Sequence, residues 1–246
     1  MSSTQADRPV VVVSSCLAGK KVRYDGSSVD DRYIKKLLEY VHPVEVCPEM
    51  EIGLPVPRKK VFLYLSERGK RLIQEGTGAD LTEDMRRFST SFLDSLGGVD
   101  GFLLKAKSPS CGITGAKAYL RPDRKIYAGR KKGIFAEAVL EKYRYFPVTD
   151  EVILRDFYRR FSFLNRLYLF FYYRVYGPEY ILSEFVHILE LFNKKRTAIF
   201  KKNPDKENFI RIFSVDLTEK RFKRKIKNGE LKKFISFPAE LLDYPA

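Results

Sequence analysis

Short apolar runs alternate with helical patterns through the first half of the chain. Residues 9–14 form a β-branched run that ends in small residues, which is typical of a strand buried on both faces. The further predicted strands are residues 41–47, 60–65 and 101–105, and the further predicted helices are residues 30–40, 80–97 and 135–143. This alternation predicts an α/β fold, with an open, mostly parallel sheet and flanking helices.

The pattern changes near Pro147. Residues 151–200 show helical periodicity crowded with aromatic side chains, and a second helix is expected from Gly177-Pro178 to Phe192. An aromatic stripe at helical spacing usually forms a core. Residues 220–227 are almost all basic, which is typical of a solvated helix face. We therefore expect an α/β domain over residues 1–148 and a smaller, basic, mainly α-helical domain over residues 149–246.

Composition and charge sharpen this picture. The chain has 246 residues, of which 44% are hydrophobic and 14% aromatic, enough to build a packed core. Its net charge is +15, with 26 basic and 19 acidic residues in 1–150 and the remaining 20 and 12 in 151–246. Such an excess attracts polyanions, which makes RNA a candidate partner. The alternative is an ordinary highly charged surface.

The sequence contains no pattern expected of a membrane or secreted protein. The longest apolar run, residues 167–173, is far shorter than a membrane span, and no signal peptide is visible. The three cysteines are an odd number and widely spaced, which fits reduced thiols better than a disulfide framework. We expect a soluble cytoplasmic protein, and nothing indicates an obligate protein partner.

Each cysteine follows a predicted strand directly or within a few residues. These are Cys16, Cys47 and Cys111. Because ligands bind at the carboxyl ends of parallel strands, the three sulfurs are expected to share one edge of the sheet. No Cys-x-x-Cys pair is present and there are only two histidines, which excludes thioredoxin-type, zinc-ribbon and histidine-rich sites.

The neighbours of the cysteines decide between a site and ordinary buried thiols, which are common in cores. Ser14 and Ser15 precede Cys16 and offer hydroxyls to a thiolate. Lys105 and Lys107 precede Cys111, and lysines near sulfur favour the charged thiolate. These neighbours favour a functional site.

The segments around the cysteines carry a family resemblance. They are Ser-Ser-Cys-Leu-Ala-Gly at 14–19, Val-Arg-Tyr-Asp-Gly at 22–26, Val-Cys-Pro-Glu-Met-Glu-Ile-Gly-Leu-Pro-Val-Pro-Arg at 46–58, Gly-Ala-Asp-Leu-Thr at 78–82 and Lys-Ala-Lys-Ser-Pro-Ser-Cys-Gly at 105–112. In this order they resemble the thiouracil desulfidase family, whose domain was long catalogued as one of unknown function. The resemblance covers about residues 8–145.

The resemblance implies a [4Fe–4S] cluster held by Cys16, Cys47 and Cys111. One iron would then lack a protein ligand, and such a soft Lewis acid prefers thiocarbonyl sulfur to carbonyl oxygen. In the mechanism that the resemblance implies, water attacks C4 of a thiolated uracil and sulfur leaves as hydrosulfide, with no net electron transfer. The expected enzyme is an iron–sulfur-dependent, non-redox desulfidase.

Two further residues are candidates for proton transfer. Glu49, two residues from Cys47, is the candidate to activate water, and Ser108 could hand on a proton or bind the base edge. The alternatives are a surface or helix-capping carboxylate for Glu49 and a turn hydroxyl for Ser108. The remaining expected substrate-binding residues, which shape the pocket or hold phosphate, are Ser14, Ser15, Arg23, Asp25, Arg58, Lys105, Lys107 and Ser110.

The basic second domain bears on the substrate. Family members with a helical extension act on 4-thiouridine in tRNA, whereas single-domain members act on free thiouracil, so the resemblance implies tRNA as partner by analogy. A desulfidase of free thiouracil or thiouridine remains an alternative. So do a hydrolase using a zinc ion on the three cysteines and a non-enzymatic RNA-binding module.

Overall fold

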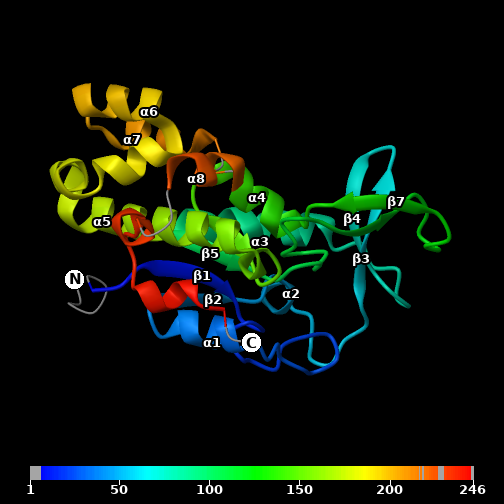
Figure 1. Cartoon of the computed structure of the whole chain (residues 1–246). Helices are drawn as coiled ribbons and strands as arrows, with labels where there is room; N and C mark the ends of the chain where they lie inside the picture. The colour runs from blue at the N-terminus through cyan, green and yellow to red at the C-terminus, as the bar shows by residue number, and fades with distance from the viewer. Residues whose placement is uncertain (1–6, 216, 218, 227–229, 245–246) are drawn as a thin grey trace.

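A four-stranded parallel sheet forms the centre of the computed structural model, which describes residues 7–215, 217, 219–226 and 230–244. The strand order is β2-β1-β5-β8, and every neighbouring pair is parallel. The strands are β1 (Val10–Ser14), β2 (His42–Val46), β5 (Gly101–Leu104) and β8 (Val148–Asp150). Three of these strands lie where the sequence predicts them, and the carboxyl ends of β1, β2 and β5 point the same way (Figure 1).

Helices cover both faces of this sheet. Val11 and Val13 of β1 pack in one hydrophobic cluster with α1 (Arg32–Leu38) and α5 (Phe157–Glu184). Val12 between them packs in a second cluster with α3 (Thr82–Ser95) and α4 (Ile134–Lys142). Successive side chains point to opposite faces of a strand, so a run of valines is buried only when both faces are covered. The expected α/β architecture is confirmed.

A second sheet stands beside the first. Its order is β4-β3-β6-β7, and it is mixed, since only β3 and β6 are parallel. The strands are β3 (Val61–Ser66), β4 (Gly69–Gln74), β6 (Ala116–Tyr119) and β7 (Tyr127–Lys131). The predicted strand 60–65 lies here rather than beside the cysteine-bearing strands: it pairs with β6 on one side, and on the other a tight turn at Gly69 (φ 98°) folds β4 back onto it.

The C-terminal part is helical and rich in buried aromatic rings. Helix α5 is interrupted at Gly177 (φ 83°), before Pro178, and ends at Glu184, so the helix expected to run from there to Phe192 is divided. It is followed by α6 (Val186–Lys202), α7 (Lys206–Arg211) and α8 (Glu219–Lys225), with 3-10 turns at Ile153–Arg155, Ile212–Ser214, Leu231–Phe234 and Ala239–Leu242. The basic run largely coincides with α8, and Lys227 at its end lies outside the described residues.

The helical part packs directly on the parallel sheet. Phe161, Leu164 and Leu167 of α5 share a core with Val11 and Val13. Arg174 of α5 donates to both carboxylate oxygens of the buried Asp100, at 2.8 and 2.7 Å. The division between residues 148 and 149 stays a prediction; β8 at that point belongs to the parallel sheet. Among the described helices, none combines the length and the apolarity that crossing a membrane requires.

Candidate functional site

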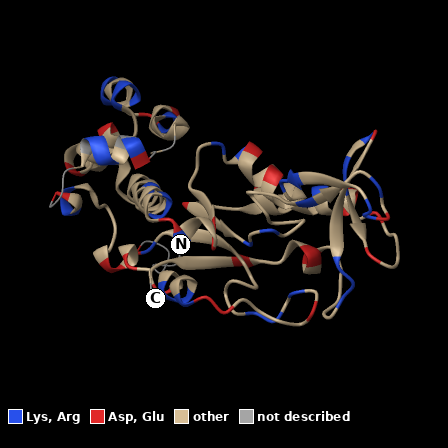
Figure 2. Ribbon diagram, turned by 45° about the vertical axis from the view of Figure 1, so that its right-hand side comes forward, with Lys and Arg blue, Asp and Glu red and all other residues tan. Residues whose placement is uncertain are grey.

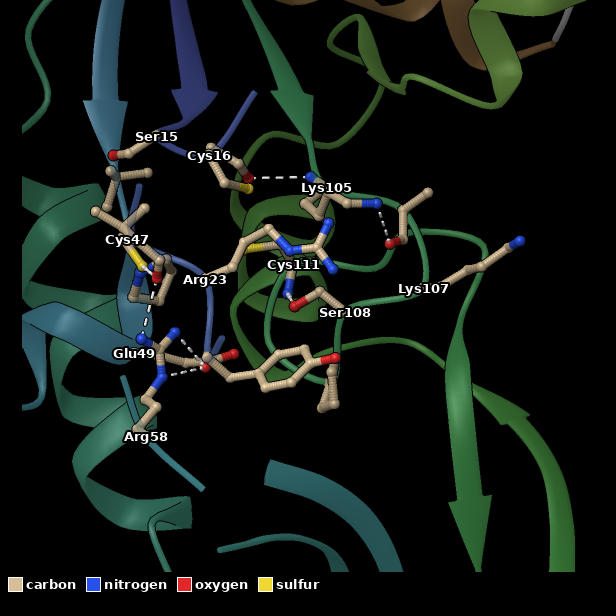
Figure 3. A pocket seen from close by; sticks show the side chains of 17 residues that line it. Ser15, Cys16, Arg23, Cys47, Glu49, Arg58, Lys105, Lys107, Ser108 and Cys111 are labelled. Carbon is tan, nitrogen blue, oxygen red and sulfur yellow. Dashed lines mark hydrogen bonds and ion pairs between the residues drawn. The ribbon is translucent and has the colours of Figure 1, made fainter. Parts of the chain in front are cut away.

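The carboxyl ends of β1, β2 and β5 open onto a cavity of ≈ 320 Å³. Cys16, Cys47 and Cys111 all line it (Figure 3). Cys16 follows β1 by two residues, Cys47 directly follows β2, and Cys111 lies in the loop after β5. The expectation that three strand ends bring these sulfurs to one edge therefore agrees with the structure.

The three thiols lie in a shielded environment and interact electrostatically. Cys16 and Cys111 are buried, and Cys47 is half-buried. Burial raises the pKa of Cys16 to about 11, and it also raises the pKa values of Cys47 and Cys111. A negative charge on Cys47 raises the pKa of the other two further, because the sulfurs are close enough to repel one another.

Smaller effects oppose this rise in pKa. The charge of Lys105 lowers the pKa of Cys16, a hydrogen bond with Ser14 lowers that of Cys111, and the backbone amide of Met50 lowers that of Cys47. The lysines were expected to make thiolates, but burial outweighs them. Three shielded thiolates need a compensating positive charge, which a bound metal centre would supply.

Glu49 is held in a network of hydrogen bonds at the cavity wall. Arg58 donates twice to Glu49 Oε2, from Nε at 2.9 Å and from a terminal guanidinium nitrogen at 2.7 Å. Ser110 Oγ donates to Glu49 Oε1 at 3.0 Å. The Arg58 side chain is only 3% exposed and that of Glu49 12%. Glu49 is therefore an oriented, shielded carboxylate and not a surface one.

Ser108 lines the cavity, and its hydroxyl also stabilises the turn that leads to Cys111. Its Oγ accepts hydrogen bonds from the amides of Ser110 at 3.2 Å and Cys111 at 3.1 Å. The loop is packed tightly, since a Cβ added at Gly112 would lie 2.7 Å from the Ser108 carbonyl oxygen. Ser108 thus fixes the backbone that carries Cys111.

Lys105 is anchored on the other side of the cavity. Its ammonium group pairs with the buried Glu151 and donates to the Ala106 carbonyl at 3.0 Å. Glu151 Oε2 also accepts from the Ala106 amide at 2.9 Å, and Ser14 Oγ accepts from the Lys105 amide at 3.0 Å. The β1 and β5 strand ends are thereby joined through side chains.

The other predicted residues divide between the cavity and its surroundings. Arg23, Ser15 and Lys107 line the cavity. Asp25 does not: its Oδ1 accepts from the amide of Ser27 at 3.1 Å and from its hydroxyl at 2.6 Å, so it shapes a turn. The substrate-binding roles of these residues stay predictions.

Two residues of the site were missed by sequence reasoning. Tyr24 lines the cavity and offers an aromatic ring, with the Lys60 ammonium 4.8 Å from its centroid. Its place in the Val-Arg-Tyr-Asp-Gly segment, next to Arg23, was the available signal. Glu151 carried no such signal, because only the pairing of β8 with β5 brings it to Lys105.

Comparisons with known proteins complete the description of the site. Residues 11–151 match the family model described as 2-thiouracil desulfurase. The chain is 31% identical over 110 residues to the uncharacterized protein YbbK of Bacillus subtilis (strain 168), across 42% of this chain and 73% of YbbK. A solved structure of the [4Fe-4S]-dependent thiouracil desulfidase TudS is 28% identical, with a TM-score of 0.48, over 60% of this chain and 94% of that chain.

Proposed function

The chain belongs to the 2-thiouracil desulfurase family, and we propose that it is an iron–sulfur-dependent desulfidase that converts thiolated uracil to uracil, with 4-thiouridine in tRNA as its substrate. The observation that carries the proposal is the convergence of three cysteines on one cavity. In the net reaction a thiocarbonyl and water give a carbonyl and hydrogen sulfide. No electrons are gained or lost.

The donor set fits a [4Fe–4S] cluster better than a single zinc ion. A zinc ion at about 2.3 Å from each sulfur would hold the sulfurs roughly 3.8 Å apart. In the described part of the chain, no three His, Cys, Asp or Glu side chains are grouped for one metal ion. A cluster would be held by one cysteine on each of three irons, which suits sulfurs that line different sides of a cavity.

When bound to Cys16, Cys47 and Cys111, the cluster would supply an iron without a protein ligand, a soft Lewis acid suited to thiocarbonyl sulfur. The protein's own groups supply the proton chemistry. Glu49 Oε1 keeps a free lone pair beside the Ser110 hydrogen bond, so it can take a proton from attacking water. Arg58, which also lines the cavity, holds the carboxylate in a fixed orientation.

The charge of the chain supports RNA as the carrier of the thiolated base. A net charge of +15 attracts a polyanion but offers nothing specific to a free, neutral base. The competing proposal, a desulfidase of free thiouracil or thiouridine, needs only the cavity and leaves the charge without a role.

Anaerobic purification and activity assays test the proposal. We expect about four irons and four sulfides per chain, and release of sulfide from thiolated tRNA and from 4-thiouracil, with 2-thiouracil as a comparison. Replacing any cysteine by serine should lose the iron and all turnover: Cys16→Ser, Cys47→Ser and Cys111→Ser. Zinc without iron in active protein would overturn the cluster assignment, and turnover of the free base alone would overturn the RNA assignment.

A further inference from the structure

A basic hairpin arm extends from the second sheet. It comprises residues 115–133, with β6 and β7 and the turn between them. The arm contains seven lysines and arginines and a single acidic residue, Asp123. Six of the seven are exposed, namely Lys117, Arg121, Lys125, Arg130, Lys131 and Lys132. Figure 2 shows the resulting blue positions along the strands and loops of this sheet.

Most of this charge is available to a ligand. Within the arm, ion pairs reach Arg121, which lies 3.5 Å from Asp123, and Arg124, which pairs with Glu75. Across the described residues, no carboxylate is within ion-pair distance of Lys117, Lys125 or Lys131. Lys117 lies on β6, Lys125 in the turn and Lys131 on the edge strand β7. Exposed cations without acidic partners attract phosphate groups rather than stabilise the fold.

Exposed apolar side chains accompany these cations at the tip. Leu120 is 50% exposed, Ile126 46% and Tyr127 55%. The amide of Leu120 donates to the Ile126 carbonyl at 2.9 Å, so these residues sit together at the closed end of the hairpin. Exposed aromatic and aliphatic surface between cations is the combination that holds nucleic acid, since bases stack on it while phosphates meet the charges.

The base of the arm is fixed to the cysteine loop. Strand β6 begins shortly after Cys111, and at the other end Gly133 donates to the Gly112 carbonyl at 2.9 Å. A Cβ added at Gly133 would lie 2.3 Å from the Ser110 carbonyl oxygen, so the two backbones are in direct contact. Whatever the arm holds is therefore kept at a fixed place relative to the cavity.

The C-terminal helices are a less suitable RNA surface. Figure 1 shows α6 and α7 at the opposite end of the molecule from β3, β4 and β7. The cavity opens at the carboxyl ends of β1, β2 and β5, on the side of the second sheet. On α8, Lys223 pairs with Glu219 at 2.7 Å, which neutralises part of that run.

We propose that the arm of residues 115–133 is the surface that binds substrate RNA and presents its thiolated base to the cavity. This inference rests on the proposed function and assigns its RNA contacts. Phosphates lie along Lys117, Lys125 and Lys131, and an unpaired base stacks at Tyr127. The C-terminal helices complete the core of the parallel sheet and contribute little to RNA affinity.

A pair of matched triple variants tests this assignment in the cluster-loaded full chain. The arm variant is Lys117→Ala, Lys125→Ala, Lys131→Ala, and the control is Lys194→Ala, Lys195→Ala, Lys202→Ala on α6. These exposed lysines remove the same charge from the other end of the molecule. Affinity for thiolated tRNA is measured at several salt concentrations, and turnover is measured with tRNA and with free 4-thiouridine.

We expect the arm variant to bind tRNA at least tenfold more weakly at low salt. The slope of log affinity against log salt should become less steep by roughly 2 to 3. Each lost phosphate contact accounts for about 0.7–0.9 of this change, and three lysines are removed. Turnover of free 4-thiouridine should equal that of the parent, which also shows that the variant is folded. The control should bind tRNA as the parent does.

The outcomes separate this inference from the function on which it rests. If the parent acts on thiolated tRNA and the arm variant binds it as tightly as the parent, the arm inference is overturned alone. If the control variant loses affinity and the arm variant keeps it, the RNA binds to the C-terminal helices. The arm inference is then also overturned, and the proposed function stands. If the parent acts on the free nucleoside and not on tRNA, both proposals fail.

Discussion

Replacing Glu49 by glutamine separates the proposed catalytic carboxylate from its structural role. The substitution preserves the size of the side chain and one acceptor oxygen for Arg58, but it removes the charge and the basic lone pairs. Glu49 is held by two hydrogen bonds from Arg58 and one from Ser110, so the amide is expected to occupy the same place. The cysteines are not touched by the change.

The environment of Glu49 sets the expected loss of folding free energy and the expected fall in rate. Arg58 is 3% exposed, and it also donates to the Val22 carbonyl at 3.0 Å, so it keeps neutral acceptors after the change. Removal of one partner of a buried pair costs about 3–5 kcal/mol, and retention of a neutral acceptor should reduce this loss of folding free energy to about 1–3 kcal/mol. Loss of a general base lowers the rate by about 10²- to 10⁴-fold.

The assay follows three quantities on the same anaerobic preparation. Iron per chain should equal that of the parent, and Tm should fall by a few degrees. The kcat for sulfide release from 4-thiouracil should fall at least 100-fold. Ser110→Ala is the matched control, because it removes the hydrogen bond at 3.0 Å to Glu49 Oε1 and leaves the carboxylate in place. Its kcat should fall tenfold or less.

Two results would refute the assignment of Glu49 as the base. A glutamine variant with full iron content and the parent kcat would show that Glu49 serves only as the counter-charge of Arg58. A variant that loses iron and activity together would show that Glu49 holds the loop of Cys47. The role in water activation requires full iron with a slow rate.

Two further predictions concern packing around the site. Gly133→Ala should lower the free energy of unfolding by about 1–3 kcal/mol, because its Cβ would lie 2.3 Å from the Ser110 carbonyl oxygen. Chemical denaturation measures this loss, with Gly97→Ala as the control, because nothing lies within 4 Å of a Cβ added at Gly97. Arg174→Ala should cost about 3–5 kcal/mol, because it leaves Asp100, 1% exposed, as an unpaired buried carboxylate. Full stability of either variant in the same measurement would contradict the packing described.

The hydrophobic pattern was sufficient for the central sheet. Val10 to Val13 form a run that only a strand covered on both faces can bury, and the segment at 101–104 follows the same rule. The segment at 42–46 is a partly exposed edge strand in which only Val46 is buried. Strands β4, β6, β7 and β8 were not predicted. They are short or mix charged and apolar residues, as in Gly69–Gln74 and Tyr127–Lys131, so local periodicity is weak there.

The sequence by itself determined that each cysteine follows a strand, and the alternation of strands and helices predicted that parallel strands would end at one edge. Only the tertiary structure decided which side chains meet around them. Glu49 reaches Ser110 across 61 positions of the chain, and Lys105 reaches Glu151 across 46. A local pattern records whether a residue is buried and in which element. The partner of a buried charge depends on the path of the whole backbone, which brings distant strand ends to one edge.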